Sequence, residues 1–201
     1  KNINLSLKKL NINFSLSEKK LSILILPLLV KIKRYDHLLR VAVNSKIISI
    51  SLRGRLKPSK RFDAILLPYQ RPIPTLKNLY YKKILKKLSS IDIKKTEIIL
   101  FQNNLLSEGC TTNIFCIHNK IIYIPKTNFY KGTTMNYLLS KTERVSKKIN
   151  ISIHELSKFD EILLVGSGKG VISLQSINKT NWRSKSDLIY KELSYLYKKI
   201  I

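Results

Sequence analysis

Hydrophobic residues recur at helical spacing near both ends of the chain and in short strand-like runs between them. Spacing of three and four residues predicts helices over 3–10, over 17–32 and over 186–201. Ser17 is the cap candidate of the second helix. The apolar run at 21–30 contains Pro27 and is too short to cross a bilayer, so it predicts a buried helix rather than a membrane span.

The middle of the chain alternates between short apolar runs and turn residues, which is typical of strands. The pairs Asn44-Ser45, Asn103-Asn104 and Asn119-Lys120 mark turns between such runs. The patterns predict strands at 38–43, 47–52, 64–67, 96–101, 113–118, 121–124, 151–153, 161–165 and 170–177, and helical segments at 79–88, 132–148 and 156–159.

Many strands with helices at the margins indicate an α+β fold. Pro68, Pro72 and Pro74 lie in a stretch that can be neither regular helix nor central sheet, so they indicate a connector. We therefore expect a small N-terminal α/β part at 1–69, incomplete at its start, and a larger C-terminal part at 70–201.

Composition is that of a globular protein, since 44% of the 201 residues are hydrophobic. The formal net charge of +26 raises a non-catalytic nucleic-acid-binding protein as an alternative. The lysines are scattered along the chain and form no continuous basic stripe with aromatic residues between them. Nucleic acid and membrane are therefore not expected as partners. A salt-sensitive shift on generic DNA, with no yellow colour in the purified protein, would favour the alternative.

Cys110 and Cys116 are the only cysteines, and no nearby histidine spacing makes a metal site. They are predicted to be reduced thiols in a cytoplasmic protein, and no metal is expected.

Candidate chemistry gathers in four places along the chain. Lys77 is an amine that could form a Schiff base, and Glu108 is a carboxylate in a predicted Ser-Glu-Gly turn. Two loops of small residues follow, Lys131-Gly132-Thr133-Thr134 and Val165-Gly166-Ser167-Gly168. An amine, a carboxylate and loops rich in backbone donors are together what a pyridoxal phosphate site needs.

Between residues 76 and 177 these motifs resemble, in order and spacing, the class IV aminotransferases. These are the fold-type IV pyridoxal phosphate enzymes, which include branched-chain aminotransferase, D-amino acid aminotransferase and aminodeoxychorismate lyase. The resemblance implies pyridoxal 5'-phosphate as the cofactor, a pseudo-barrel of mixed strands in the larger part, and a homodimer. It places Asn2 where the family has a phosphate-binding Arg, and it leaves the family's opening strands missing.

By this resemblance Lys77 binds the cofactor covalently and moves the proton of the substrate, which needs a lysine that can be neutral near pH 7. Tyr81 is the candidate for a hydrogen bond to the cofactor's phenolic oxygen. Glu108 lies against the pyridine nitrogen and keeps it protonated, so that the ring can accept electrons.

Thr133 and Thr134 open a helix whose N–H groups suit the cofactor phosphate. Gly166, Ser167 and Gly168 supply further donors to the phosphate and line the substrate carboxylate pocket. Although this second loop continues into Lys169, it lacks the spacing of a nucleotide-binding P-loop.

The surroundings of Lys77, Leu76-Lys77-Asn78-Leu79, together with the short chain, look more like aminodeoxychorismate lyase than the longer transaminases. The resemblance then implies conversion of 4-amino-4-deoxychorismate to 4-aminobenzoate and pyruvate, for folate synthesis. The alternative is a branched-chain or D-amino acid aminotransferase of amino-acid metabolism that uses 2-oxoglutarate.

Overall fold

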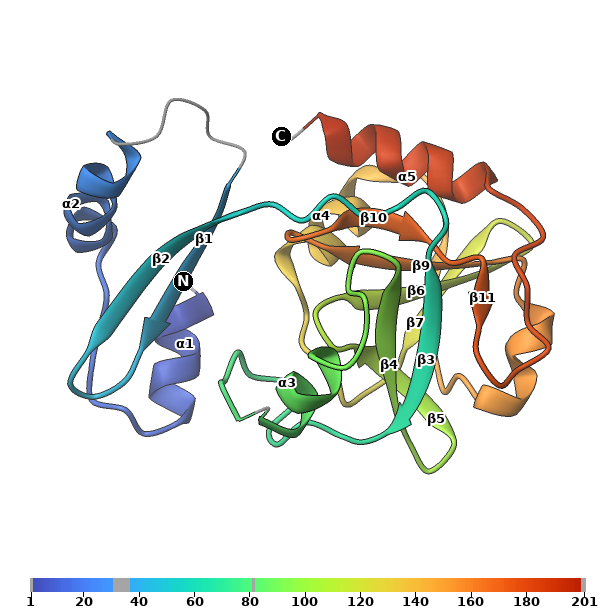
Figure 1. Ribbon diagram of the computed structural model, residues 1–201, viewed down its shortest axis with the longest axis horizontal. Helices are drawn as coiled ribbons and strands as arrows, with labels where there is room; N and C mark the ends of the chain where they lie inside the picture. The colour runs from blue at the N-terminus through green and yellow to red at the C-terminus, as the bar shows by residue number, and fades with distance from the viewer. Residues whose placement is uncertain (1, 31–36, 81, 200–201) are drawn as a thin grey trace. The chain divides into compact units, whose positions relative to one another are not determined.

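A computed structural model describes residues 2–30, 37–80 and 82–199 (Figure 1). By its internal contacts the chain forms two compact units, one of Lys1–Arg55 with Leu76–Asn78 and one of Leu56–Thr75 with Leu79–Ile201. The expected division into a 1–69 part and a cofactor-binding 70–201 part stays a prediction. Within the described ranges, no helix is both long and apolar enough to cross a membrane.

The first unit contains two helices and a hairpin: α1 (Asn2–Lys9), α2 (Glu18–Leu29), β1 (His37–Val43) and β2 (Ile48–Gly54). The side-chain amide of Asn4 bonds both the N–H and the C=O of Leu16, at 3.0 Å each, and so holds α1 against the segment before α2. Asn44 Oδ1 accepts the N–H groups of Lys46 and Ile47. These bonds close the hairpin turn predicted at Asn44-Ser45.

Helix α2 corrects one expectation. Ser17 caps it, with its side chain accepting the N–H of Lys20 at 3.1 Å. The predicted burial is wrong, however, because the helix has no buried residue and Ile23 is 60% exposed. The described part of this unit offers only α1 and a two-stranded hairpin, which is too little surface to cover a helix that is apolar on most sides. The predicted end at residue 32 lies outside the described residues.

The second unit contains two sheets. The four-stranded sheet has the order β11-β3-β4-β5, and the five-stranded sheet has the order β10-β9-β6-β7-β8. The strands are β3 (Asp63–Pro68), β4 (Thr96–Gln102), β5 (Leu105–Gly109), β6 (Asn113–His118), β7 (Ile121–Pro125), β8 (Ser146–Ile149), β9 (Glu161–Gly166), β10 (Gly170–Ser173) and β11 (Ser176–Ile177). The helices are α3 (Lys82–Leu88), α4 (Thr133–Lys141), the 3₁₀ segment η1 (Ile153–Lys158) and α5 (Leu188–Lys198).

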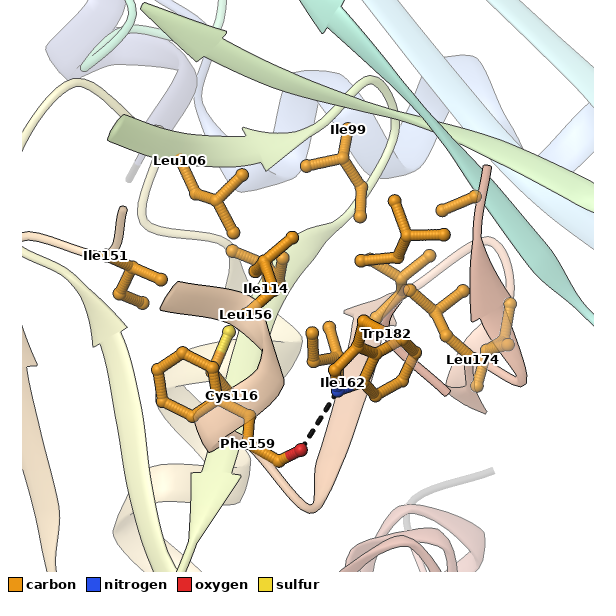
Figure 2. Packing of buried hydrophobic residues seen from close by; sticks show 14 of the residues in the cluster. Ile99, Leu106, Ile114, Cys116, Ile151, Leu156, Phe159, Ile162, Leu174 and Trp182 are labelled. Carbon is orange, nitrogen blue, oxygen red and sulfur yellow. Dashed lines mark hydrogen bonds between the residues drawn. The ribbon is translucent and has the colours of Figure 1, made fainter. Parts of the chain in front are cut away.

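Side chains of the five-stranded sheet alternate between two hydrophobic cores. In β6, Ile114 and Cys116 belong to a core between the sheets, whereas Phe115 and Ile117 belong to a core under α4 and α5. This alternation is the period-two pattern of a strand buried on both faces. Trp182 joins the inter-sheet core, and its Nε1 donates to the carbonyl of Phe159 at 2.9 Å (Figure 2).

The two sheets are connected at both ends. After β10 the chain crosses to the other sheet, where β11 pairs in parallel with β3. At the far side Leu105 forms an isolated bridge with Ser152, and Leu106 donates to the carbonyl of Ile151. The strands predicted at 170–177 and 151–153 are therefore corrected, because the first breaks where it changes sheets and the second contributes only this bridge before η1.

Helix α4 ends at Lys141 rather than at the predicted residue 148. The hydroxyl of Thr142 and the guanidinium of Arg144 both bond Glu192 of α5, at 2.9 Å each. These contacts hold the chain in extended conformation after Lys141, and Ser146–Ile149 then adds β8 to the edge of the sheet, parallel to β7. The predicted helix at 79–88 likewise appears in shorter form as α3. The α+β class of the fold is confirmed.

Candidate active site

Asn113, the first residue of β6, lies where three loops meet. Its Nδ2 donates to the carbonyl of Tyr130 at 2.6 Å, and its Oδ1 accepts the N–H of Gly132 at 3.1 Å. Its register partner on β9 is Val165, which directly precedes Gly166. Asn113 therefore gathers the loop that follows Glu108, the loop that opens α4, and the glycine turn between β9 and β10.

Two glycines allow these loops to approach so closely. A Cβ at Gly132 would lie 2.4 Å from Asn113 Oδ1, so a side chain there would displace the amide that organises the site. A Cβ at Gly166 would lie 3.2 Å from the carbonyl oxygen of Thr111. A side chain at position 166 would therefore be crowded against the turn after Glu108.

Glu108 is a buried carboxylate at the end of β5, opposite Leu100 of β4, instead of in a turn as expected. Nε and Nη2 of Arg71 both donate to its Oε1 at 2.7 Å, and the N–H of Tyr130 donates to its Oε2 at 3.1 Å. Arg71 Nη2 also donates to the carbonyl of Pro74 at 3.1 Å. Since the side chains of Arg71 and Glu108 are only 9% and 5% exposed, each holds the other in place inside the fold.

The start of α4 is suited to an anion. Gly132 occupies the N-cap position and gives no side-chain cap bond, so the N–H groups of the first turn have no side-chain cap in the described part of the chain. Thr134 is buried there and Thr133 is exposed. Free N–H groups at a helix start, together with the helix dipole, attract negative charge.

A buried hydroxyl beside Glu108 is also available to bond a ligand. Thr112 Oγ1 has no hydrogen-bond partner among the described residues, although buried hydroxyls normally have one. It lies against Gly109, where a Cβ would come within 2.2 Å of it. An orphaned hydroxyl, a positioned carboxylate and an uncapped helix start together fit a ligand with a protonated ring nitrogen and a phosphate.

Cys110 follows Gly109 and is half-buried. Burial raises the pKa of its thiol well above the ordinary value, and the nearby carboxylates of Glu97 and Glu108 raise it further. Burial alone raises the pKa of the fully buried Cys116. Both cysteines are free and carry protonated thiols at neutral pH, so neither is suited to act as a nucleophile.

The predicted site residues divide into three groups. The second unit brings Glu108, Thr133, Thr134, Gly166, Ser167 and Gly168 onto the loops organised by Asn113. Lys77 is exposed and is grouped with the first unit by its contacts. Tyr81 lies outside the described residues, as does the side chain of Asn2. The roles of all these residues stay predictions.

Sequence reasoning missed Arg71 as the partner of Glu108. A signal was present, because only eight of the 38 basic residues are arginines and this one lies among the prolines of the connector. An arginine in a chain that otherwise uses lysine indicates a bidentate or buried contact. The bonds of Asn113 to the loop that opens α4 could not be read from the sequence either.

Comparisons with known proteins identify the family of the chain. Residues 1–177 match the model of the family described as amino-transferase class IV. No curated protein sequence matches the chain.

Three solved structures illustrate the likeness of the fold. A putative 4-amino-4-deoxychorismate lyase from Legionella pneumophila superposes with a TM-score of 0.82 at 18% identity, over 98% of this chain and 82% of that one. A putative branched-chain amino acid aminotransferase from Thermotoga maritima also gives 0.82, at 17% identity, over 98% and 77%. An aminotransferase from Brucella abortus bound to the cofactor PLP gives 0.76 at 16% identity, over 99% and 81%. The chain therefore belongs to the class IV aminotransferase family and has the fold-type IV architecture of its solved members.

Proposed function

We propose that this protein is a pyridoxal phosphate-dependent lyase that converts 4-amino-4-deoxychorismate to 4-aminobenzoate and pyruvate. The observation that carries the cofactor assignment is the convergence on Asn113 of a positioned carboxylate, an uncapped helix start and a glycine turn. Family membership supports the same cofactor, which is present in the Brucella abortus structure. By the same resemblance we propose a cytoplasmic homodimer.

Each group has a separate task in this proposal. The N–H groups at the start of α4 and those of the turn at 166–168 bind the phosphate, and Glu108 faces the ring nitrogen. When bound, the cofactor supplies an electron sink for the carbanion formed at the substrate carbon. Arg71 and the N–H of Tyr130 fix both oxygens of Glu108, so that its orientation does not depend on the ligand. Lys77 holds the cofactor covalently and moves the substrate proton.

Lys77 is expected to be the residue that joins the cofactor. Borohydride reduction of the yellow holoprotein, followed by peptide mapping, should find the cofactor on Lys77 alone, and Lys77→Met should abolish the label. The matched control is Lys82→Met, five positions away, which should keep it. A label on Lys82, Lys83 or Lys169 in the unaltered chain would contradict the assignment.

The choice of lyase rests on the surroundings of Lys77, Leu76-Lys77-Asn78-Leu79, which resemble those of aminodeoxychorismate lyase. In that reaction the ring carbon loses a proton, the enolpyruvyl group leaves, gains a proton and becomes pyruvate, and the ring becomes aromatic. No amino-group acceptor is consumed. The alternative is a transaminase, and the fold does not separate the two, because the lyase and the aminotransferase structures superpose equally well.

The products decide between these reactions. We expect the holoprotein to release pyruvate and 4-aminobenzoate in equal amounts from aminodeoxychorismate, with no 2-oxoglutarate added. A transaminase requires a keto acid to regenerate its cofactor, so its turnover stops after one equivalent without one. Conversion of leucine or valine to keto acids with matching glutamate formation, while aminodeoxychorismate is left untouched, would establish the alternative.

A further inference from the structure

A second buried ion pair lies beside the candidate site. Lys169 Nζ donates to Oε2 of Glu97 at 2.8 Å, and the two side chains are only 8% and 0% exposed. The hydroxyl of Thr111 donates to the same oxygen at 2.7 Å. Glu97 is the second residue of β4, Thr111 lies in the turn after Glu108, and Lys169 lies in the glycine turn. One carboxylate thus joins three segments of the chain.

Lys169 has a fixed place in the glycine turn. Its backbone N–H donates to the carbonyl of Gly166 at 3.3 Å, which closes the turn, and its ammonium lies 5.2 Å from the ring centroid of Phe62. The side chain therefore leaves the turn and crosses to β4, seventy-two residues earlier in the sequence. Its attachment at both ends restrains the backbone between Gly166 and Lys169.

This restraint acts where the glycine turn leaves little room for a side chain beside the turn after Glu108. A Cβ at Gly166 would lie 3.2 Å from the carbonyl oxygen of Thr111, and Lys169 reaches the carboxylate that the Thr111 hydroxyl also bonds. The Glu97 carboxylate therefore attaches the glycine turn to the turn after Glu108. Because glycines have the greatest backbone freedom, a turn of the sequence Gly-Ser-Gly needs such external contacts to keep one conformation.

We propose that Lys169 is a positioning residue, which through Glu97 and Thr111 holds the N–H groups of residues 166–168 aimed at the cofactor phosphate. The inference rests on the proposed cofactor. It concerns the phosphate and not the ring, because the ring is assigned to Glu108. Loss of the Lys169 contact should then weaken binding of a ligand that has the phosphate and leave a ligand that lacks it unaffected.

The test compares pyridoxal 5'-phosphate with pyridoxal, both titrated by absorbance against the full chain. Lys169→Met should weaken the binding of pyridoxal phosphate about tenfold to a hundredfold, the weight of one hydrogen bond to a charged group, and should change the affinity for pyridoxal less than about twofold. Lys169→Arg, which keeps the charge, should recover most of the affinity. Lys191→Met is the matched control, because it removes a lysine from the exposed pair with Asp187, and it should change neither affinity.

A second variant keeps the test valid if Lys169→Met alone folds poorly. Glu97→Gln combined with Lys169→Met removes both buried charges, and the amide oxygen still accepts the Thr111 hydroxyl. It should unfold at a higher temperature than Lys169→Met and still show the phosphate-specific loss. If the binding of both ligands is weakened equally, or if neither is weakened, the inference is overturned while the proposed function stands. If the unaltered chain binds neither ligand, the proposed function and the inference are both wrong.

Discussion

Glu108→Gln is expected to lower turnover about a hundredfold to a thousandfold while the cofactor stays bound, the size of effect seen when one positioned electrostatic group is removed from a developing charge. The amide is nearly isosteric, and its oxygen still accepts from Arg71. It carries no negative charge, however, and cannot keep the ring nitrogen protonated. Steady-state kinetics together with absorbance titration of the cofactor would measure both quantities.

Two further variants separate chemistry from folding. Glu108→Ala should also lower the free energy of unfolding by about 3–5 kcal/mol, because it leaves the charge of Arg71 buried without its partner. Glu192→Gln is the matched control, since Glu192 also pairs with an arginine but is 29% exposed, and its turnover should be unchanged. Full turnover of Glu108→Gln with cofactor bound would exclude the ring-nitrogen role.

The strands were predictable wherever burial imposes a strict pattern. The apolar runs of β6 and β9 are buried on both faces, and the turn between β6 and β7 is formed by Asn119 and Lys120, both at positive φ. Asparagine tolerates that backbone region better than most residues, so its presence between two apolar runs identified the hairpin correctly. For these elements, the residues of the strands and of the turn between them were sufficient for the prediction.

Elements that depend on distant partners could not be predicted. The sequence of β8 is Ser-Lys-Lys-Ile, which has no apolar alternation, and it becomes a strand only because β7 lies beside it. The end of α4 is similarly set by Glu192, fifty residues after Thr142. Helix periodicity through 142–148 was therefore misleading, because tertiary contacts decided the conformation.

The residues of the candidate site divide in the same way, into local motifs and distant partners. Glu108 and the two small-residue loops could be proposed from the sequence because each is a local motif with local chemistry. The residues that hold these motifs in place could not be proposed from the sequence, since Arg71 lies 37 residues before Glu108 and Glu97 lies 72 residues before Lys169. The sequence thus predicts which groups meet the ligand, and the structure adds the groups that hold those residues in position.

Glu161 is expected to contribute more to stability than any surface carboxylate. It begins β9, is 1% exposed, and accepts the N–H groups of Ile189 and Tyr190 at 2.9 and 2.8 Å and the hydroxyl of Ser186 at 3.0 Å. Asp187, at the N-cap position of α5, makes no side-chain cap bond among the described residues. A carboxylate from another strand therefore caps this helix, and it also meets the positive end of the helix dipole.

Glu161→Ala should lower the free energy of unfolding by about 3 kcal/mol, because α5 loses its cap and the N–H groups of Ile189 and Tyr190 lose their acceptor. For a chain of this length that corresponds to a fall of about 6–12 °C in Tm. Helix α5 covers the core formed by Leu163 and Val165, so its loosening should expose that core to solvent. Glu192→Ala, which breaks a partly exposed ion pair of α5, should cost only about 1 kcal/mol or less. Thermal and denaturant unfolding of both variants measure the difference, and equal losses would show that Glu161 acts as an ordinary surface charge.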